Sequence, residues 1–103
     1  MAKKLKPVDP GEILREEFMA ILGLSMNRMA MDLRVPVTRI ADIVNGRGGI
    51  SADTAPRFAR YFQNSRTSWM NLQTRYDLEI AEDEISAEAE RDVQPLESLA
   101  VRD

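Results

Sequence analysis

The chain has 103 residues, a length typical of one domain. It contains no Cys and no His, which excludes disulfides, cysteine nucleophiles, histidine-based catalytic triads and the commonest metal ligands. Carboxylate, Lys or Tyr chemistry stays open, but no convergent pair of carboxylates is visible, so we expect no enzyme, no metal site and no cofactor. No stretch approaches the roughly 20 apolar residues that span a bilayer, and no apolar segment follows the basic start, so we expect a cytoplasmic protein without membrane contact.

The formal net charge of −3 averages two segments of opposite sign. Residues 1–76 hold 12 Lys and Arg against 7 Asp and Glu, whereas residues 77–103 hold 2 Arg against 10 Asp and Glu. A basic segment is typical of proteins that bind the phosphate backbone of nucleic acids. The acidic segment is either a solvated terminus or a segment that binds a partner or shields the basic one, and both interpretations stay open.

The spacing of apolar residues predicts helices separated by short turns, with no alternation typical of strands. The first helix begins at Asp9, an N-cap followed by Pro10 at the first helical position and by Glu12 three residues after the cap. Gly23 ends this helix. Its predicted buried face consists of Leu14, Phe18, Ile21 and Leu22.

Two shorter helices follow. Ser25 is the N-cap of the second helix, and Pro36 stands at the entrance of the third, which covers residues 37–44 and ends at Asn45 and Gly46. The predicted inward residues of the pair and its link are Met29, Ala30, Leu33, Val35, Ile40, Ile43 and Val44. Two short helices joined by about three residues form a helix-turn-helix, in which the second helix enters the DNA major groove.

Two longer apolar patterns complete the chain. Ser51 caps a fourth helix, in which Pro56 loosens or kinks the first turn. Ser65 caps a fifth helix that continues to about Arg91, before Pro95 stops it. The inward residues are Ala55, Phe58, Ala59 and Phe62 in the fourth helix and Trp69, Leu72, Tyr76 and Ile80 in the fifth.

The sequence thus predicts an all-α fold, a five-helix bundle that contains a helix-turn-helix. We divide it into an N-terminal arm of residues 1–8, a DNA-binding domain of residues 9–80 whose last helix dimerises, and an acidic, partly disordered extension of residues 81–103.

The outward face of the third helix carries the predicted base contacts. Val37 can contact a thymine methyl group, Thr38 can bond a base edge or a phosphate, and Arg39 can reach guanine or a phosphate. Asp42 either accepts a hydrogen bond from cytosine or pairs locally with Arg39 or Arg28. The alternative is that Arg39 is an ordinary solvated charge.

Phosphate contacts are predicted on both sides of that helix. Asn45 and Arg47 follow it, although Asn45 can equally be a helix C-cap alone and Arg47 a solvated charge. Ser25, Asn27 and Arg28 begin the preceding helix, where the helix dipole favours phosphate.

Three separated segments resemble one family. Residues 10–18 (PGEILREEF), 43–55 (IVNGRGGISADTA) and 69–78 (WMNLQTRYDL) are similar, in this order, to the HigA antitoxins. These are helix-turn-helix proteins of the Xre/Cro type, also labelled virulence-associated protein I. The resemblance implies a lambda-repressor-like domain that dimerises and binds a palindromic operator in its own promoter. It also implies a partner, a HigB toxin that is a RelE-type ribonuclease encoded beside it.

Some positions depart from the family pattern. Arg34 stands where the family usually has a turn glycine with positive φ, so either the turn is slightly altered or the Arg34 side chain meets a DNA phosphate. Met26 stands where many relatives carry a phosphate-binding Gln. The expected dimer interface consists of Trp69, Leu72 and Tyr76.

Two other functions remain open at this point. The first is a stand-alone regulator of the Xre type without a toxin partner. The second is a protein-interaction domain that has lost DNA binding, which the acidic total charge and the substitutions at Met26 and Arg34 keep under consideration.

Overall fold

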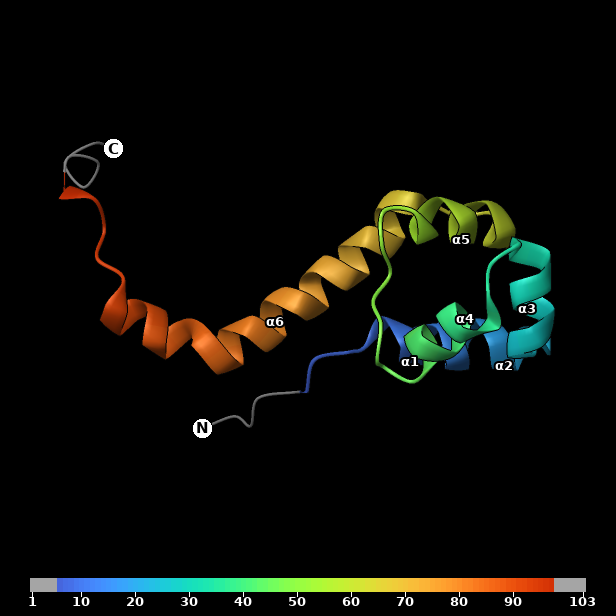
Figure 1. Cartoon of the computed structure of the whole chain (residues 1–103), viewed down its shortest axis with the longest axis horizontal. Helices are drawn as coiled ribbons and strands as arrows, with labels where there is room; N and C mark the ends of the chain where they lie inside the picture. The colour runs from blue at the N-terminus through green and yellow to red at the C-terminus, as the bar shows by residue number, and fades with distance from the viewer. Residues whose placement is uncertain (1–5, 98–103) are drawn as a thin grey trace.

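The computed structural model describes residues 6–97, and every regular element within that range is helical. Helix α1 (Pro10–Ile13), the π-helical segment η1 (Leu14–Met19) and α2 (Ala20–Leu22) follow one another without a break and form one helix. Four further helices follow, α3 (Met26–Leu33), α4 (Val37–Val44), α5 (Thr54–Phe62) and α6 (Arg66–Asp92) (Figure 1). The predicted all-helical fold of five helices is confirmed.

The π-helical segment corrects the predicted buried face of the first helix. Leu14 is fully buried and Phe18 partly buried, as expected, but Ile21 is 74% exposed and Leu22 is 59% exposed. A π-helix closes its turns with hydrogen bonds five residues apart, so it advances fewer degrees per residue than an α-helix. The inward position therefore passes to Met19, which is 6% exposed, and the prediction for Ile21 and Leu22 is wrong.

Side-chain caps fix where three of the helices begin. Asp9, Ser25 and Ser65 each accept a hydrogen bond from a backbone N–H of the following turn, over 2.8, 3.0 and 3.1 Å respectively. The three predicted N-caps are confirmed. Gly23 has φ +67°, the left-handed conformation predicted for the end of the first helix.

The start of α5 differs slightly from the prediction. The hydroxyl of Ser51 accepts a hydrogen bond from the N–H of Thr54 over 3.2 Å, and residues 52–53 form a turn, so α5 begins at Thr54. Pro56 then lies in the first helical turn, where its missing N–H removes no helical hydrogen bond. The loosened or kinked first turn expected from Pro56 is therefore wrong, because α5 begins three residues after Ser51 and Pro56 lies where no helical N–H bond is needed.

An aromatic cluster forms the centre of the core. The Trp69 ring lies 5.1 Å from the Phe18 ring, 5.2 Å from Phe58 and 6.0 Å from Phe62, measured between centroids. Its indole N–H donates a hydrogen bond to Oδ1 of Asn64 over 2.8 Å. Trp69 is 2% exposed. Its ring packs against other rings of the same chain, and its indole N–H has a hydrogen-bond partner there. This burial removes Trp69 from the expected dimer interface.

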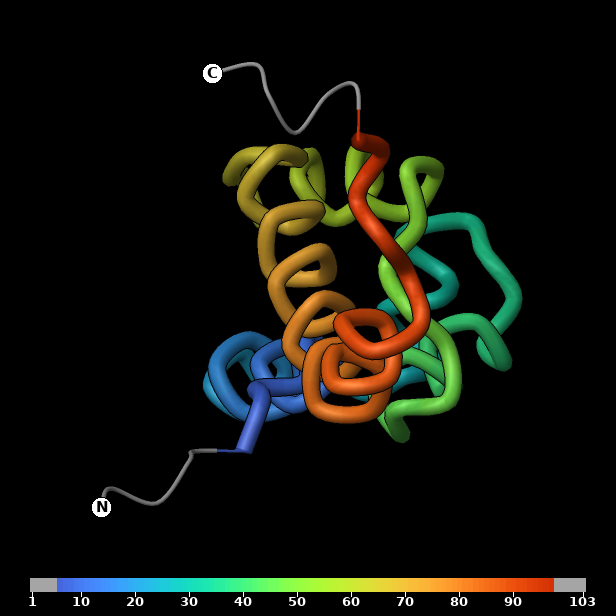
Figure 2. Tube along the Cα trace, turned by 90° about the vertical axis from the view of Figure 1, so that its left-hand side faces the viewer, coloured from blue at the N-terminus to red at the C-terminus, as the bar shows by residue number. Residues whose placement is uncertain are grey.

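The helices pack in pairs around this core. Helix α3 contacts α4 and α5, α5 contacts α6, and α1 contacts both α4 and α6, which Figure 2 shows as the N-terminal helix lying beside the descending α6. Gly11 permits the approach of α1 to α4, because a Cβ atom at this position would lie 1.8 Å from the carbonyl oxygen of Ile43. The first helix thus supports the helix-turn-helix from behind.

Helix α6 runs beyond the body of the molecule. It continues without interruption through residue 80 to Asp92, close to the predicted end at Arg91 (Figure 1). The molecule is elongated, with extents of 54 × 32 × 22 Å. Of the predicted arm and acidic extension, residues 1–5 and 98–103 lie outside the described residues.

Candidate nucleic-acid interface

A tight turn joins α3 to α4. Arg34 has φ 60° and ψ 45°, so the positive φ expected at this position is confirmed. The N–H groups of Arg34 and Val35 bond back to the carbonyl oxygens of Met31 and Ala30, over 3.3 and 3.1 Å. Pro36 then occupies the N-cap position of α4, where a residue without an N–H is tolerated. Helices α3 and α4 therefore form the predicted helix-turn-helix.

The apolar seam between α3 and α4 decides which face of α4 is free. Leu33, Ile40 and Val44 are buried and Val35 is partly buried, as predicted. Since these residues turn inward, the opposite face of α4 is open to solvent. The exposed residues at the start of α4 are Val37, Thr38 and Arg39.

An ion pair that the sequence did not predict holds Arg39. Its Nη1 lies 2.9 Å from Oδ2 of Asp53, in the turn before α5. Nε of Arg57 lies 3.7 Å from the same oxygen, and Nη1 of Arg57 donates to the carbonyl oxygen of Leu33 over 3.0 Å. Asp53 and Arg57 thus connect the end of α3 with the exposed face of α4.

The partner of Asp42 corrects a second prediction. Its Oδ1 lies 3.3 Å from Nη2 of Arg47, and not beside Arg39 or Arg28. The cause is the backbone, because the N–H groups of Arg47 and Gly48 both bond to the carbonyl oxygen of Asp42, over 2.8 and 3.0 Å. This fold-back brings the Arg47 side chain next to Asp42.

The loop after α4 is anchored at both ends. Asn45 is the C-cap of α4, its N–H bonding to the carbonyl oxygen of Ala41 over 2.9 Å, and its side chain is exposed. Gly46 follows with φ +75°. At the far end, the N–H of Ile50 donates to Oε1 of Gln73 on α6 over 2.7 Å. The loop that carries Arg47 therefore has a defined position beside α4.

The start of α3 lies on the surface of the molecule. Ser25, Asn27 and Arg28 are exposed there. Nε of Arg28 lies 2.8 Å from Oδ2 of Asp32, which also accepts a hydrogen bond from the hydroxyl of Tyr61 over 2.5 Å. The Tyr61 hydroxyl, and then Arg28, hold the pKa of the Asp32 carboxyl below its usual value, whereas burial and Asp32 raise the pKa of Tyr61.

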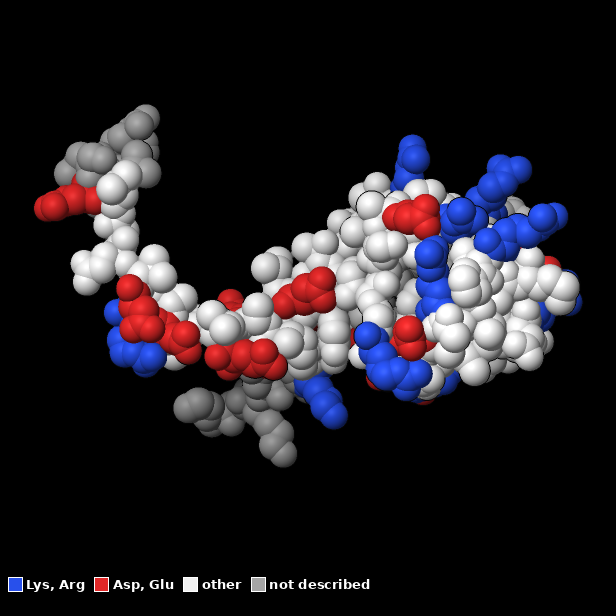
Figure 3. Space-filling model, viewed as in Figure 1, with Lys and Arg blue, Asp and Glu red and all other residues white. Residues whose placement is uncertain are grey.

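The charges divide along the molecule as the sequence predicts. Figure 3 shows Lys and Arg mostly over the compact part and Asp and Glu mostly along α6. Helix α3 and the end of α6 lie at opposite ends of the long axis (Figure 1). The described part of the acidic segment, residues 77–97, therefore does not cover the helix-turn-helix.

The remaining dimer candidates lie on α6. Leu72 and Tyr76 are partly buried and line a hollow of about 350 Å³ between the residues before α1 and the side of α6. Its other lining residues are Lys6, Val8, Ile13, Arg75 and Glu79. Unlike Trp69, both side chains keep accessible surface.

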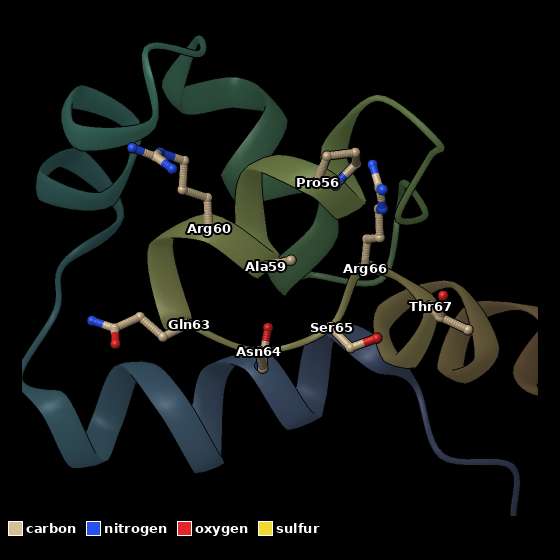
Figure 4. A pocket seen from close by; sticks show the side chains of 8 residues that line it. All are labelled: Pro56, Ala59, Arg60, Gln63, Asn64, Ser65, Arg66 and Thr67. Carbon is tan, nitrogen blue, oxygen red and sulfur yellow. The ribbon is translucent and has the colours of Figure 1, made fainter.

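The described chain has a further hollow outside the candidate interface. A hollow of about 460 Å³ lies between α5 and the start of α6, but Arg60 and Arg66 in its lining point in different directions (Figure 4). Within residues 6–97, no group of three or more acidic, His or Cys side chains is placed to hold a metal ion. No helix in that range has the length and apolarity needed to cross a membrane.

No family model matches the chain, but known proteins are similar to it in sequence and in structure. Virulence-associated protein I of Dichelobacter nodosus is 48% identical over 79 residues, 77% of this chain and 73% of the relative. Antitoxin HigA-1 of Vibrio cholerae is 31% identical over 75 residues, 73% of this chain and 70% of the relative. A solved structure of Pseudomonas aeruginosa antitoxin HigA with the higBA promoter is 42% identical, with a TM-score of 0.84 over 87% of this chain and 98% of that one.

These similarities cover the helix-turn-helix and most of the surrounding helices. The chain therefore belongs to the family of helix-turn-helix transcriptional regulators that includes virulence-associated protein I and the HigA antitoxins.

Proposed function

We propose that this protein binds an operator in its own promoter as a dimer and represses its own operon. The observation that carries the proposal is the exposed face of α4, which presents Val37, Thr38 and Arg39 outward from a well-packed helix-turn-helix. The similar antitoxin from Pseudomonas aeruginosa, solved with promoter DNA, supports it. Such a protein acts in the cytoplasm, beside the DNA of its operon.

The base contacts in this proposal come from α4. Val37, 40% exposed, packs against a thymine methyl group, and Thr38 bonds to a base edge. Arg39 donates to the acceptors of guanine, and Asp42 accepts from the amino group of cytosine. Asp42 must release Arg47 in part to do so, because the two side chains are paired in the free protein.

Phosphate contacts surround these base contacts. Arg34 at the turn adds a cation, and its exposed side chain is free to reach a phosphate. The N-terminus of α3 offers backbone N–H groups and a favourable dipole. The residues assigned to phosphate are Ser25, Asn27, Arg28, Arg34, Asn45 and Arg47.

Dimerisation places two copies of α4 in successive major grooves, about 34–36 Å apart on the DNA. Leu72 and Tyr76, with the hollow they line, are the proposed contact. Residues 9–80 then act as the DNA-binding and dimerising domain. The helical residues after 80 remain outside it as an acidic extension.

The proposal is tested by a gel shift with the DNA upstream of the protein's own gene and a scrambled duplex of equal length. We expect a preference for the upstream DNA, and an affinity that falls steeply between two salt concentrations as counterions are released. Equal affinity for the two duplexes would contradict the proposed repressor, and no affinity for either would favour a protein-interaction domain.

We further propose that the protein neutralises a HigB-type toxin, with the acidic end of α6 as a contact surface. Residues 77–103 hold 10 Asp and Glu against 2 Arg, and the described part of this segment, residues 77–97, extends away from the DNA-binding helices (Figure 1). Its charge suits a basic partner, and an RNA-cleaving toxin binds phosphates and is basic for that reason.

The toxin proposal is tested by co-expressing the product of the neighbouring reading frame with the full chain or with a chain that lacks residues 82–103. We expect the full chain to restore growth and the shortened chain to lose most of this protection. Full protection by the shortened chain would contradict a role for the acidic end. A neighbouring frame that encodes no small basic protein would favour a stand-alone regulator.

A further inference from the structure

We infer that Asp53 is a positioning residue that orients the Arg39 guanidinium and thereby sets the sequence specificity of the DNA interface. The inference rests on the function proposed above and assigns a role to a residue outside the helix-turn-helix. Its basis is the chain of polar contacts that ends at Arg39.

This chain of contacts begins at the end of α3. The carbonyl oxygen of Leu33 accepts a hydrogen bond from Nη1 of Arg57 over 3.0 Å. Nε of Arg57 lies 3.7 Å from Oδ2 of Asp53, and that oxygen lies 2.9 Å from Nη1 of Arg39. The backbone of the turn thus holds Arg57, Arg57 helps to hold Asp53, and Asp53 holds Arg39.

The Asp53 carboxylate does not cap α5. It occupies the N-cap position of α5, but its side chain makes no capping hydrogen bond. The hydroxyl of Ser51 makes that bond instead, with the N–H of Thr54. The side chains of Arg39 and Asp53 are 41% and 64% exposed, so their ion pair adds little to folding stability. We therefore assign this ion pair a role in orienting the Arg39 side chain rather than in stabilising the fold.

An oriented arginine has an advantage in reading DNA. Arg has many rotamers, and fixing them on binding lowers affinity, so a side chain held before binding loses less. The guanidinium has five N–H donors, and the contact with Asp53 uses one of its nitrogens. The other donors remain for O6 and N7 of guanine, which require a defined approach direction.

The carboxylate also has an effect that does not depend on the DNA sequence. Asp53 lies beside the face of α4 that meets DNA, where its negative charge opposes phosphates of any sequence. Removing this charge should strengthen binding to both kinds of DNA, and it should lower the preference for guanine because Arg39 is no longer oriented. A simple change in net charge would instead strengthen binding to both kinds of DNA equally.

The test compares four proteins, the wild type, Asp53→Asn, Arg39→Ala and the double variant. Affinities are measured at one salt concentration for the upstream DNA and a scrambled duplex. We expect Asp53→Asn to lower the ratio of the two affinities by about five- to tenfold, a value within the range for one bidentate base contact. In the Arg39→Ala background, Asp53→Asn should leave that ratio unchanged, because there is no guanidinium left to orient.

Glu16→Gln is the matched control. It removes the same charge from η1, where Glu16 pairs with Arg15, and should leave the ratio unchanged. Thermal unfolding confirms that each variant is folded. An unchanged ratio for Asp53→Asn, or an equal fall in both backgrounds, would overturn the inference while leaving the operator proposal intact. If the wild type shows no preference for the upstream DNA over the scrambled duplex, the proposed function itself is overturned.

Discussion

The hydroxyl of Tyr61 donates a hydrogen bond of 2.5 Å to Oδ2 of Asp32, and this contact joins α5 to α3. The same oxygen accepts from Nε of Arg28 over 2.8 Å. One carboxylate therefore ties the surface of the helix-turn-helix to α5, four residues along this helix from Arg57, which contacts the carbonyl oxygen of Leu33.

Tyr61→Phe should lower the free energy of unfolding at neutral pH, and the effect should disappear in acid. The Tyr61 hydroxyl is the main cause of the lowered Asp32 pKa, which lies below the usual value of an aspartate carboxyl. A lowered pKa contributes stability above the unfolded-state value and loses it as the pH falls through the folded-state value. Urea unfolding at about pH 6 and at about pH 2.5 measures the difference. A difference that stays constant between these pH values would contradict the account.

Gly11→Ala should destabilise the fold through the contact between α1 and α4. The added Cβ would lie 1.8 Å from the carbonyl oxygen of Ile43, a backbone atom that cannot move without shifting α4. The expected loss is roughly 1–3 kcal/mol, the usual cost of overpacking. Gly48→Ala is the control, because its Cβ would meet the Asp42 side chain at 3.2 Å. Equal losses for the two variants in urea unfolding would be inconsistent with a tight α1–α4 contact.

Arg34→Gly should stabilise the protein and weaken its DNA binding. Arg34 has φ 60°, a conformation that costs an L-residue about 1–2 kcal/mol but costs glycine far less. We expect a net gain of about 0.5–1 kcal/mol in the free energy of unfolding, reduced by the greater freedom of glycine in the unfolded chain. The slope of log affinity against log salt should fall by about 1, as for one lost phosphate contact.

Gln63→Gly is the matched control for Arg34→Gly. Gln63 has φ 56° at the end of α5 and is not among the residues assigned to DNA. It should give a similar gain in stability with an unchanged salt slope. If both variants change the salt slope equally, Arg34 makes no phosphate contact.

Trp69 and Tyr76 should respond differently to truncation. Trp69→Ala should cost about 3–5 kcal/mol of stability, because it empties the centre of the aromatic cluster. Tyr76→Ala, at a partly buried position, should cost less and should instead weaken the dimer. Sedimentation over a range of concentrations, together with urea unfolding, separates the two effects. A Tyr76→Ala protein with unchanged association would contradict the proposed dimer surface.

Local signals explain why most of the fold could be predicted. The caps at Ser25 and Ser65 and the turn before α4 depend on residues within a few positions of each other, so the sequence alone indicates them. The position of Ile21 could not be predicted, because the π-helical segment shifts the helical phase that periodicity assumes constant.

Family membership, and not the lack of a visible active site, confirms that the protein is a regulator rather than an enzyme.

The candidate site was only partly predictable, for a related reason. Periodicity places Thr38 on the open face of α4, since Ile40 and Val44 must turn inward. The periodicity of apolar residues does not show which charged side chains form ion pairs. Asp53 lies 14 residues from Arg39 and comes beside it only through tertiary packing. Among the polar contacts that link Leu33 to Arg39, only the pair of Asp53 with Arg57, four residues apart at the start of α5, has a local signal.

The central claim is that α4 reads the operator, and base-contact variants test it most directly. Thr38→Ala and Arg39→Ala are compared with Arg66→Ala, which removes a cation from the start of α6, outside the assigned residues. Each α4 variant should lose roughly 1–3 kcal/mol of affinity for the upstream DNA and little for the scrambled duplex, whereas Arg66→Ala should leave the preference unchanged. Unchanged affinity of both α4 variants for the upstream DNA would contradict the assignment of α4 as the recognition helix.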